Sequence, residues 1–129
     1  MQLIKIIIER NEDAFWAYSE NVEGVNGVGD TAEEAKNSAL ECIEIQKELG
    51  NFQKVITGEY QVVFKFDIES LIEYYKGIFT NAAFERLTGI SQAQISHYST
   101  GLKKPRLAQA KKIETALHKL GSELMAVEL

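Results

Sequence analysis

The stretch from Thr80 to Arg106 constrains the fold of this chain most, because it has the pattern of two short helices joined by a tight turn. Thr80 can cap the first helix, since its hydroxyl can accept a hydrogen bond from a free backbone N–H of the first turn. Phe84 and Leu87 are three residues apart and therefore share one face of that helix. Gly89 then breaks the helix, because glycine takes the positive φ of such a corner at little steric cost.

A second short helix is expected directly after this corner. Ser91 is a suitable cap for its start, and Gly101 is suited to end it. Ile95 and Tyr98 are again three residues apart, so we expect both to point toward the core. Two capped helices with apolar residues on their facing sides predict a helix-turn-helix.

The charge of the chain is unevenly distributed along the sequence. The net charge is −5, which argues against a protein that coats nucleic acid over its whole surface. Residues 1–66 carry six basic and twelve acidic side chains, whereas residues 67–129 carry eight and seven. Between residues 86 and 119 there are seven basic side chains and one acidic one. A local basic patch on an acidic chain indicates one nucleic-acid face beside a face with a different role.

Several classes of protein are disfavoured by the residues that are scarce here. Cys42 is the one cysteine, so it cannot form an intramolecular disulfide, and with two distant histidines it cannot build a metal cluster. This fits a protein of the reducing cytoplasm without a metal or another cofactor. The apolar run from Leu3 to Ile8 is too short for a signal peptide and is interrupted by Lys5. No segment is expected to span a membrane.

The first half of the chain alternates between strand and turn signals before one helix. We expect strands at residues 2–8, 14–19 and 60–66, and a brief strand at 25–28, where glycines shorten it. Thr31 and Glu34 form a capping box, which predicts a helix that begins there and stops at Gly50. The order β-β-β-α-β over residues 1–66 predicts one helix laid on a small antiparallel sheet.

The second half is predicted to be all-helical, which makes the whole chain an α+β protein of two domains, 1–66 and 67–129. Asp67 is expected to cap a helix that ends near Gly77. Pro105 places residues 102–106 in a loop, and a last helix is expected over residues 107–120. We expect the apolar tail to pack on this chain or on a second one. Its apolar residues are Leu124, Met125, Val127 and Leu129.

The helix-turn-helix pattern suggests how the second domain would meet DNA. In this motif the N-terminal part of the second helix meets base edges, and here it carries amides, a hydroxyl and an imidazole. A glutamine can pair with adenine through both its donor and its acceptor. The basic loop that follows can reach phosphates, which supply affinity and register rather than sequence choice. The alternative is an ordinary two-helix corner whose polar face is merely solvated.

The same residues resemble the lambda-repressor-type (XRE) helix-turn-helix family. The resemblance is carried by Thr88-Gly89-Ile90-Ser91, Ile95-Ser96, Gly101 and Lys103-Lys104-Pro105. By position in that family, Asn81 and Gln92 correspond to residues that touch phosphate, and the residues after Gln92 to residues that read bases. Together with the residue pattern, this assigns base readout to Gln92, Ala93, Gln94, Ser96 and His97, and phosphate contact to Asn81, Lys103, Lys104 and Arg106. Glu85 departs from the family, which usually has a small residue there, so its carboxylate needs a partner or an outward rotamer.

The first domain resembles the HicB antitoxin family. The resemblance is carried by Phe15-Trp16-Ala17-Tyr18-Ser19, by Val25 to Val28, by Gly29-Asp30-Thr31 and by Glu33-Glu34-Ala35. It implies a partial ribonuclease-H-like domain without nuclease activity, which binds the small basic RNA-cleaving toxin HicA and blocks its active site. It also implies that the second domain represses the operon by binding double-stranded operator DNA. Symmetric operators require two recognition helices, so we expect a homodimer or a higher homo-oligomer.

The partner surface and the absence of catalysis can be argued from the residues. A nuclease of this fold needs clustered carboxylates to hold divalent metal. The first strand carries only Lys5 among apolar residues, so we expect that the protein is not an enzyme.

The acidic first domain suits a basic partner. We assign partner binding to Phe15, Trp16 and Tyr18, although alternation leaves open whether Trp16 and Tyr18 or Phe15 face outward. The alternative function is a helix-turn-helix transcription regulator whose first domain senses a small ligand.

Overall fold

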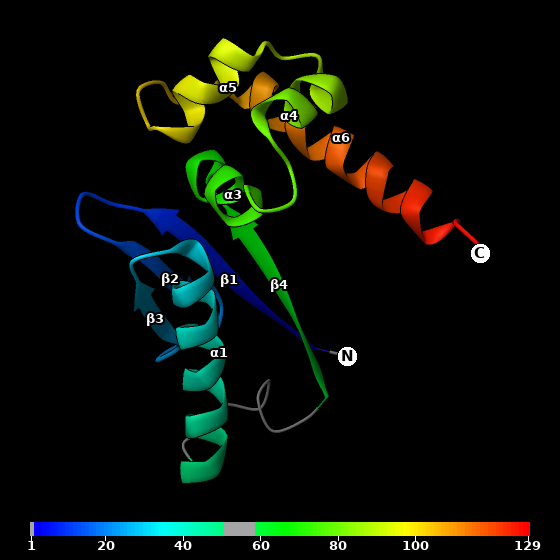
Figure 1. Cartoon of the computed structure of the whole chain (residues 1–129). Helices are drawn as coiled ribbons and strands as arrows, with labels where there is room; N and C mark the ends of the chain where they lie inside the picture. Colours follow the sequence, from blue (N-terminus) through cyan, green and yellow to red (C-terminus); the bar gives the residue numbers. More distant parts are fainter. Residues whose placement is uncertain (1, 51–58) are drawn as a thin grey trace. The chain divides into compact units, whose positions relative to one another are not determined.

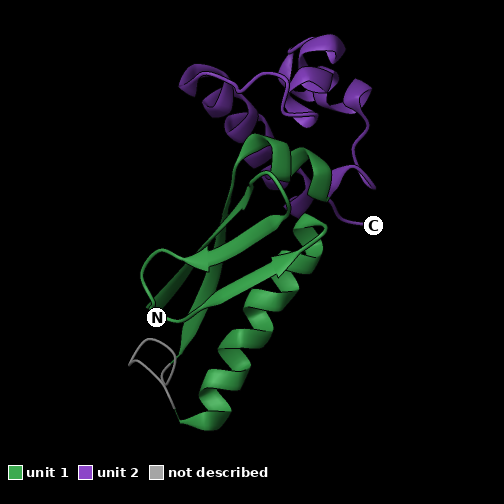
Figure 2. Ribbon diagram, turned by 90° about the vertical axis from the view of Figure 1, so that its left-hand side faces the viewer, with its two compact units in different colours: residues 1–74 green, residues 75–129 purple. Residues whose placement is uncertain are grey.

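The computed structural model describes residues 2–50 and 59–129 as a mixed α+β chain (Figure 1). These residues form one four-stranded sheet and five helices. The chain divides into two compact units, residues 1–74 and 75–129 (Figure 2). The elements in order are β1 (Gln2–Arg10), β2 (Phe15–Ser19), β3 (Asn26–Gly29), α1 (Ala32–Leu49), β4 (Tyr60–Phe66), α3 (Ile68–Tyr75), α4 (Asn81–Thr88), α5 (Gln92–Ser99) and α6 (Leu107–Met125).

The sheet of the first unit is mixed, which corrects the expectation of an antiparallel sheet. Its strand order is β3-β2-β1-β4; β1 and β2 are antiparallel, as are β2 and β3, but β4 runs parallel to β1, with Ile4 opposite Val62. Hairpins join the first three strands, so their directions must alternate. The connection from β3 to β4 contains α1, and such a crossover returns the chain to the end of the sheet where β1 begins.

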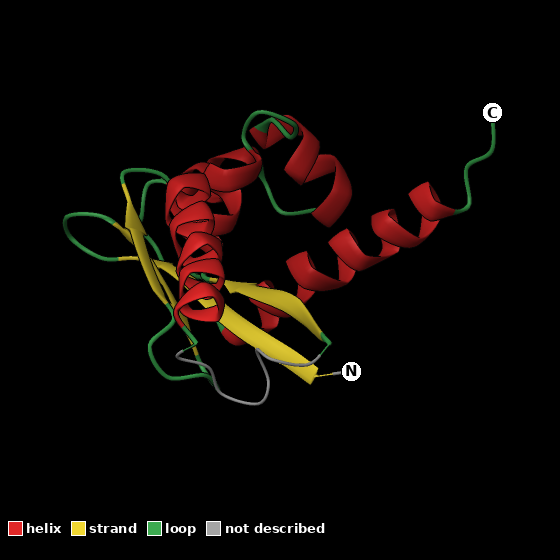
Figure 3. Cartoon of the chain, turned by 90° about the horizontal axis from the view of Figure 1, so that it is seen from below, coloured by secondary structure: helices red, strands yellow, loops and turns green. Residues whose placement is uncertain are grey.

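The core of the first unit lies between the sheet and α1, which covers one face of the sheet (Figure 3). In β1 the residues Ile4, Ile6 and Ile8 alternate with more exposed ones, and all three are fully buried. The helix contributes mainly alanines to this interface, with Ile43 as its largest buried side chain. Because alanine is small, the helix axis can approach the sheet closely.

The predicted brief third strand is confirmed. The positions of Gly27 and Gly29 explain why this strand is rich in glycine. A Cβ atom added to Gly27 would lie 2.6 Å from the carbonyl oxygen of Ala35 and closer still to the backbone nitrogen of Ala39. A Cβ atom at Gly29 would lie 2.8 Å from the backbone nitrogen of Ala35. The backbone of α1 therefore rests directly on β3, and these positions have no room for a side chain.

The predicted caps of α1 are present at both ends. The Thr31 hydroxyl accepts a hydrogen bond from the Glu34 backbone N–H (3.1 Å). The Glu34 carboxylate accepts from the backbone N–H of Asp30 (2.8 Å), one residue earlier than a standard capping box would have it. Gly50 ends the helix with φ of 72°. These interactions involve close sequence neighbours, which is why the pattern predicted them correctly.

Helix α3 is fastened to the first unit, although the sequence pattern assigns it to the start of the second domain. The Asp67 carboxylate accepts from the backbone N–H groups of Ser70 (2.8 Å) and Arg10 (3.0 Å), which joins the start of α3 to the end of β1. Glu73 accepts from the backbone N–H of Ala32 (3.0 Å) at the start of α1. These bonds link residues far apart in the sequence, so local patterns do not predict them.

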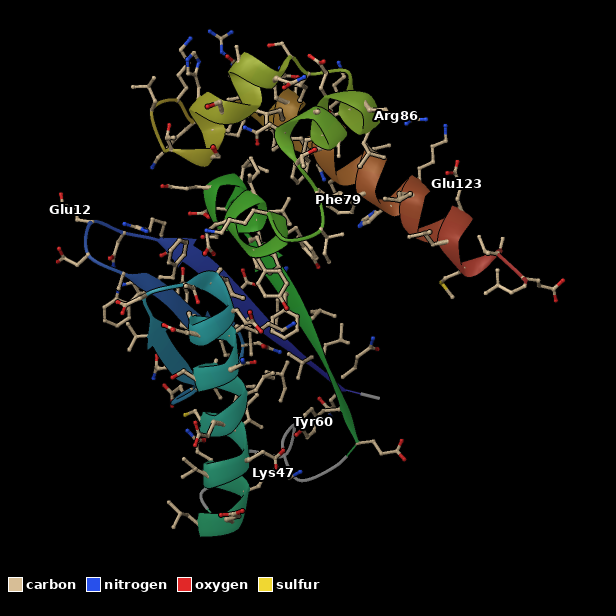
Figure 4. The ribbon with its side chains drawn as sticks, in the orientation of Figure 1. Glu12, Lys47, Tyr60, Phe79, Arg86 and Glu123 are labelled. Atoms are coloured by element: carbon tan, nitrogen blue, oxygen red, sulfur yellow. The ribbon has the colours of Figure 1, made fainter. Side chains whose placement is uncertain are left out.

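The second unit packs three helices around a small core. Phe84, Ile95 and Ile113 come from α4, α5 and α6 respectively, and all three are fully buried. The ring of Phe79, labelled in Figure 4, meets the ring of Phe84 edge to face, with 5.6 Å between the centroids. Because α4 packs against both α5 and α6, it holds the helix-turn-helix pair on the long last helix.

Helix α6 is longer than predicted and carries an exposed apolar end. It was expected to stop at residue 120 but continues through Gly121 to Met125, because the helix-forming residues on either side offset the cost of about 1 kcal/mol for one glycine. Leu124 and Val127 are each 61% exposed and Met125 is 90% exposed. Within the second unit, the described residues therefore leave the apolar tail exposed, and packing on a second chain stays a prediction.

Candidate nucleic-acid interface and partner surface

The corner between α4 and α5 is held by short-range hydrogen bonds. The Thr80 hydroxyl accepts from the backbone N–H of Ala83 (3.0 Å), and Gly89 adopts φ of 76°, as predicted. Thr88 is 6% exposed; its hydroxyl donates to the carbonyl of Phe84 (2.6 Å) and accepts from the backbone N–H of Ile90 (3.1 Å). The sequence pattern did not predict a structural role for the Thr88 hydroxyl. A threonine just before the glycine of such a turn nevertheless indicates a side chain that hydrogen-bonds to the nearby backbone.

Helix α5 has the orientation that the apolar spacing predicts. Ile95 is fully buried and Tyr98 is 3% exposed, while Gln92 and Ala93 are exposed at the opposite side. The Ser91 hydroxyl accepts from the backbone N–H of Gln94 (3.2 Å) and caps the helix. The first turn of α5 therefore presents polar and small groups to solvent.

Three of the predicted base-reading side chains are only partly exposed. The Gln94 side-chain amide donates to the Tyr98 hydroxyl (2.9 Å), which holds the amide against the helix. His97 is half-buried, and its Nδ1 atom is buried without a hydrogen-bond partner among the described residues. The imidazole is therefore only partly open to solvent, and its role in base readout stays a prediction. Ser96 is also half-buried.

Glu85, the departure from the family pattern, has a defined partner. Its carboxylate accepts a hydrogen bond from the backbone N–H of Gln92 (3.0 Å), the first residue of α5. The side chain thus crosses from α4 to the start of the next helix and satisfies a donor that has no partner within α5. The Gln92 side chain remains exposed, but its backbone N–H is already occupied.

Three basic residues of the predicted phosphate-binding loop lie around one hollow. Gly101 turns the chain with φ of 78°, and the backbone N–H of Lys103 donates to the carbonyl of His97 (3.2 Å), so the loop folds back past the end of α5. The hollow has a volume of about 510 Å³ and is lined by Gln94, Tyr98, Lys103, Lys104, Arg106 and Gln109. Within residues 2–50 and 59–129, no ion pair is formed by any of these three cations.

The structure does not bring all predicted phosphate contacts together. Lys103, Lys104 and Arg106 share the hollow with Gln94, whereas Asn81 is half-buried at the first position of α4 and does not line it. The unit itself is basic: residues 75–129 carry eight basic and four acidic side chains, against six and fifteen in residues 1–74. The difference in net charge between the two compact units is therefore larger than the difference between residues 1–66 and 67–129.

The sheet face opposite α1 forms an exposed apolar strip. Trp16 is 42% exposed, whereas Phe15 is 3% exposed and belongs to the core, which decides the open question about this strand. Phe15 was also assigned to partner binding; that assignment is corrected, because a core residue has no surface to offer. Trp16 lies opposite Val28 of β3, and these two side chains form the strip. Leu3, which is 49% exposed on the same face, lies six residues along β1 from Glu9, the residue that pairs with Trp16.

Polar groups border this apolar strip. Tyr18 is half-buried opposite Ile7 of β1. Burial, followed by the charge and hydrogen bond of Glu9, raises the pKa of the Tyr18 hydroxyl above its ordinary value. Lys5 and Glu20 form an ion pair beside it (3.3 Å). An apolar centre with a polar border is the usual composition of a protein-binding surface.

Comparison of the chain with protein-family models, with curated proteins and with solved structures found no match. No group of three or more potential metal-ligating side chains occurs in the described part of the chain. Among the same residues, none of the helices combines the length and the apolar character needed to cross a membrane. The site therefore has to be interpreted from its own geometry.

Proposed function

We propose that this protein is a HicB-type antitoxin that represses its own operon. In this proposal the second unit binds operator DNA as a lambda-repressor-type helix-turn-helix, and the first unit binds a small basic toxin of the HicA type. The observation that carries the DNA half is the orientation of α5. Its apolar residues Ile95 and Tyr98 are buried, and Gln92 and Ala93 at its start are exposed. The cations of the loop that follows form no ion pair among the described residues.

The dimensions of α5 and of its surroundings suit the major groove of DNA. A helix with its side chains is about 10–12 Å across, and the groove is about 12 Å wide. Gln92 and Ala93 are exposed at the end of the helix that enters the groove in this motif. The hollow with Lys103, Lys104 and Arg106 is also lined by Gln94 and Tyr98 of α5, and phosphate contacts there would fix the register.

Replacing Gln92 with alanine tests base readout. We expect the affinity for the duplex upstream of this protein's own gene to fall about 5- to 150-fold, the value of one bidentate contact of about 1–3 kcal/mol. Affinity for a random duplex should stay within about twofold, because a neutral amide contributes little to phosphate binding. Gln61→Ala removes an exposed amide from β4 and serves as the control. Equal affinity of the wild-type protein for both duplexes would rule out operator binding.

The toxin-binding half of the proposal rests on the exposed apolar strip and on charge. Leu3, Trp16 and Val28 are each between 42% and 49% exposed on one sheet face. The first unit has fifteen acidic and six basic side chains, which would attract a basic partner and speed its encounter. An RNA-cleaving toxin has a basic surface because it binds phosphates, so it matches this unit in charge.

Trp16→Ala should weaken binding of the small basic protein encoded beside this gene by about 30-fold or more. The reason is that buried aromatic anchors at the centre of an interface typically contribute 2 kcal/mol or more. Co-expression of the two proteins, co-purification and titration calorimetry measure the effect. Ile45→Ala, which removes a side chain of similar exposure from α1, is the control and should bind as the wild type does. If no small basic protein co-purifies with the wild type, the antitoxin half is wrong.

A homodimer is part of the proposal. One recognition helix covers only a half-site, and a two-fold symmetric operator therefore requires two chains. The exposed apolar residues at the end of α6 offer a surface for a second copy, with Met125 the most exposed of its helical residues. The size of the purified protein, measured in the same co-expression experiment, tests this part.

A further inference from the structure

The start of α5 carries a negative charge that comes from outside the helix. Glu85 lies on α4, seven residues before Gln92, and its carboxylate accepts the Gln92 backbone N–H at 3.0 Å. The first turn of α5 has no acidic residue of its own. The hydroxyl of Ser91 occupies a second donor, the backbone N–H of Gln94. The first N–H groups of a helix have no partner within the helix itself. Two of these groups in α5 are therefore already paired with side chains of this protein.

A helix start is ordinarily attractive to phosphate, because its backbone N–H groups are unpaired and the helix dipole is positive there. In this chain the carboxylate of Glu85 takes up one of these donors and places a full negative charge beside the others. A phosphate approaching Gln92 or Ala93 would meet a like charge at a distance of a few ångströms. The basic hollow, which is lined by Gln94 and Tyr98 of α5 and by the cations of the following loop, has no such carboxylate among its lining residues.

We propose that Glu85 sets the specificity of this interface by keeping phosphate away from the start of α5. Contact with the DNA backbone is then made at the hollow with Lys103, Lys104 and Arg106, and the first turn of α5 meets base edges alone. Binding to random DNA is weakened because one phosphate contact is denied, whereas the base contacts that distinguish the operator are kept. The inference rests on the proposed function in so far as the phosphate belongs to DNA.

The substitution Glu85→Gln separates charge from hydrogen bonding. The glutamine side-chain oxygen can still accept the Gln92 N–H, so α5 keeps its start while the negative charge is lost. Glu85→Ala removes both the charge and the hydrogen bond. Faster hydrogen exchange of the Gln92 backbone amide in this variant would measure how much the hydrogen bond stabilises the start of α5. Glu123→Gln is the matched control: it changes the net charge equally but lies exposed near the end of α6 (Figure 4).

The first measurement is the binding of a random-sequence duplex over a range of salt concentrations. We expect Glu85→Gln to bind about tenfold more tightly than the wild type at low salt. The slope of log K against log salt should steepen by about 0.9, the value of one additional phosphate contact. Glu123→Gln should change the affinity less than about twofold and leave the slope unchanged. The ratio of operator to random affinity should fall in Glu85→Gln alone.

The second measurement is independent of DNA. The full chain, labelled with nitrogen-15, is titrated with inorganic phosphate, and the amide signals of Gln92 and Ala93 are followed. They should stay unchanged in the wild type and in Glu123→Gln, and shift in Glu85→Gln. Wild-type shifts of the same size as those in Glu85→Gln, or no response in Glu85→Gln, would overturn the inference. Equal wild-type affinity for operator and random duplex would instead reject the proposed function, and the phosphate titration would still decide the role of Glu85.

Discussion

Replacing Lys103, Lys104 and Arg106 together with alanine should lower the affinity for both operator and random DNA by about 500-fold at 0.1 M salt. Each phosphate contact releases about 0.9 counterions, which at this salt concentration corresponds to about eightfold in affinity. The three side chains line one hollow and form no ion pair within the described ranges, so all three charges are available to phosphate. The salt slope should become shallower by about 2.7.

A second triple variant controls for the change in net charge. Lys111, Lys112 and Lys119 are exposed on α6 and do not line the hollow. Their replacement with alanine removes the same charge, and we expect it to lower affinity only a few-fold, through the long-range field. Circular dichroism of both variants verifies that the helices are intact. An equal loss in the two variants would mean that DNA binding depends on total charge and not on the hollow.

Gly27→Ala should destabilise the first unit by about 3 kcal/mol or more. The added Cβ would lie 2.6 Å from the Ala35 carbonyl oxygen and 2.9 Å from the carbonyl carbon of Ser38, both in the backbone of α1. A flexible side chain could move aside, but a helix backbone can relieve this overlap only by shifting away from the sheet and opening the core. Urea unfolding followed by circular dichroism measures the change in the free energy of unfolding.

The matched control for this substitution is Gly121→Ala. Gly121 lies inside α6, and beyond its chain neighbours and the adjacent helix backbone no atom of the described residues lies within 4 Å of its added Cβ. The same chemical change should therefore stabilise the protein by about 0.5–1 kcal/mol, because alanine is the better helix former. If Gly27→Ala unfolds at the same urea concentration as the wild type, the close contact between α1 and β3 is not present in solution.

Features that depend on a few neighbouring residues were predictable from sequence. The caps formed by Thr31, Thr80 and Ser91 are present, and Gly50 and Gly89 end their helices as expected. Each of these features joins groups no more than four residues apart, so the local pattern contains all the information needed. The burial of Ile95 and Tyr98 was predictable for the same reason, since helical spacing determines which residues share a face.

Features that depend on distant residues were not predictable in this way. The direction of β4 follows from the path of α1, and the outward face of β2 follows from the position of that helix on the sheet. Alternation indicated that Phe15 and Trp16 lie on opposite faces but not which face is covered. Similarly, the partner of Glu85 is the backbone of a different helix, which its sequence position alone does not reveal.

The amino-acid order was sufficient to establish where most elements begin and end, which helix face is apolar, and where positive charge concentrates. Packing between elements settled the mixed sheet, the exposure of Trp16, the hollow beside α5 and the carboxylate at that helix's start. The physical reason is range: caps and helical periodicity act over about one turn. Burial and charge pairing, in contrast, depend on which segments meet in space, and that is a property of the folded chain.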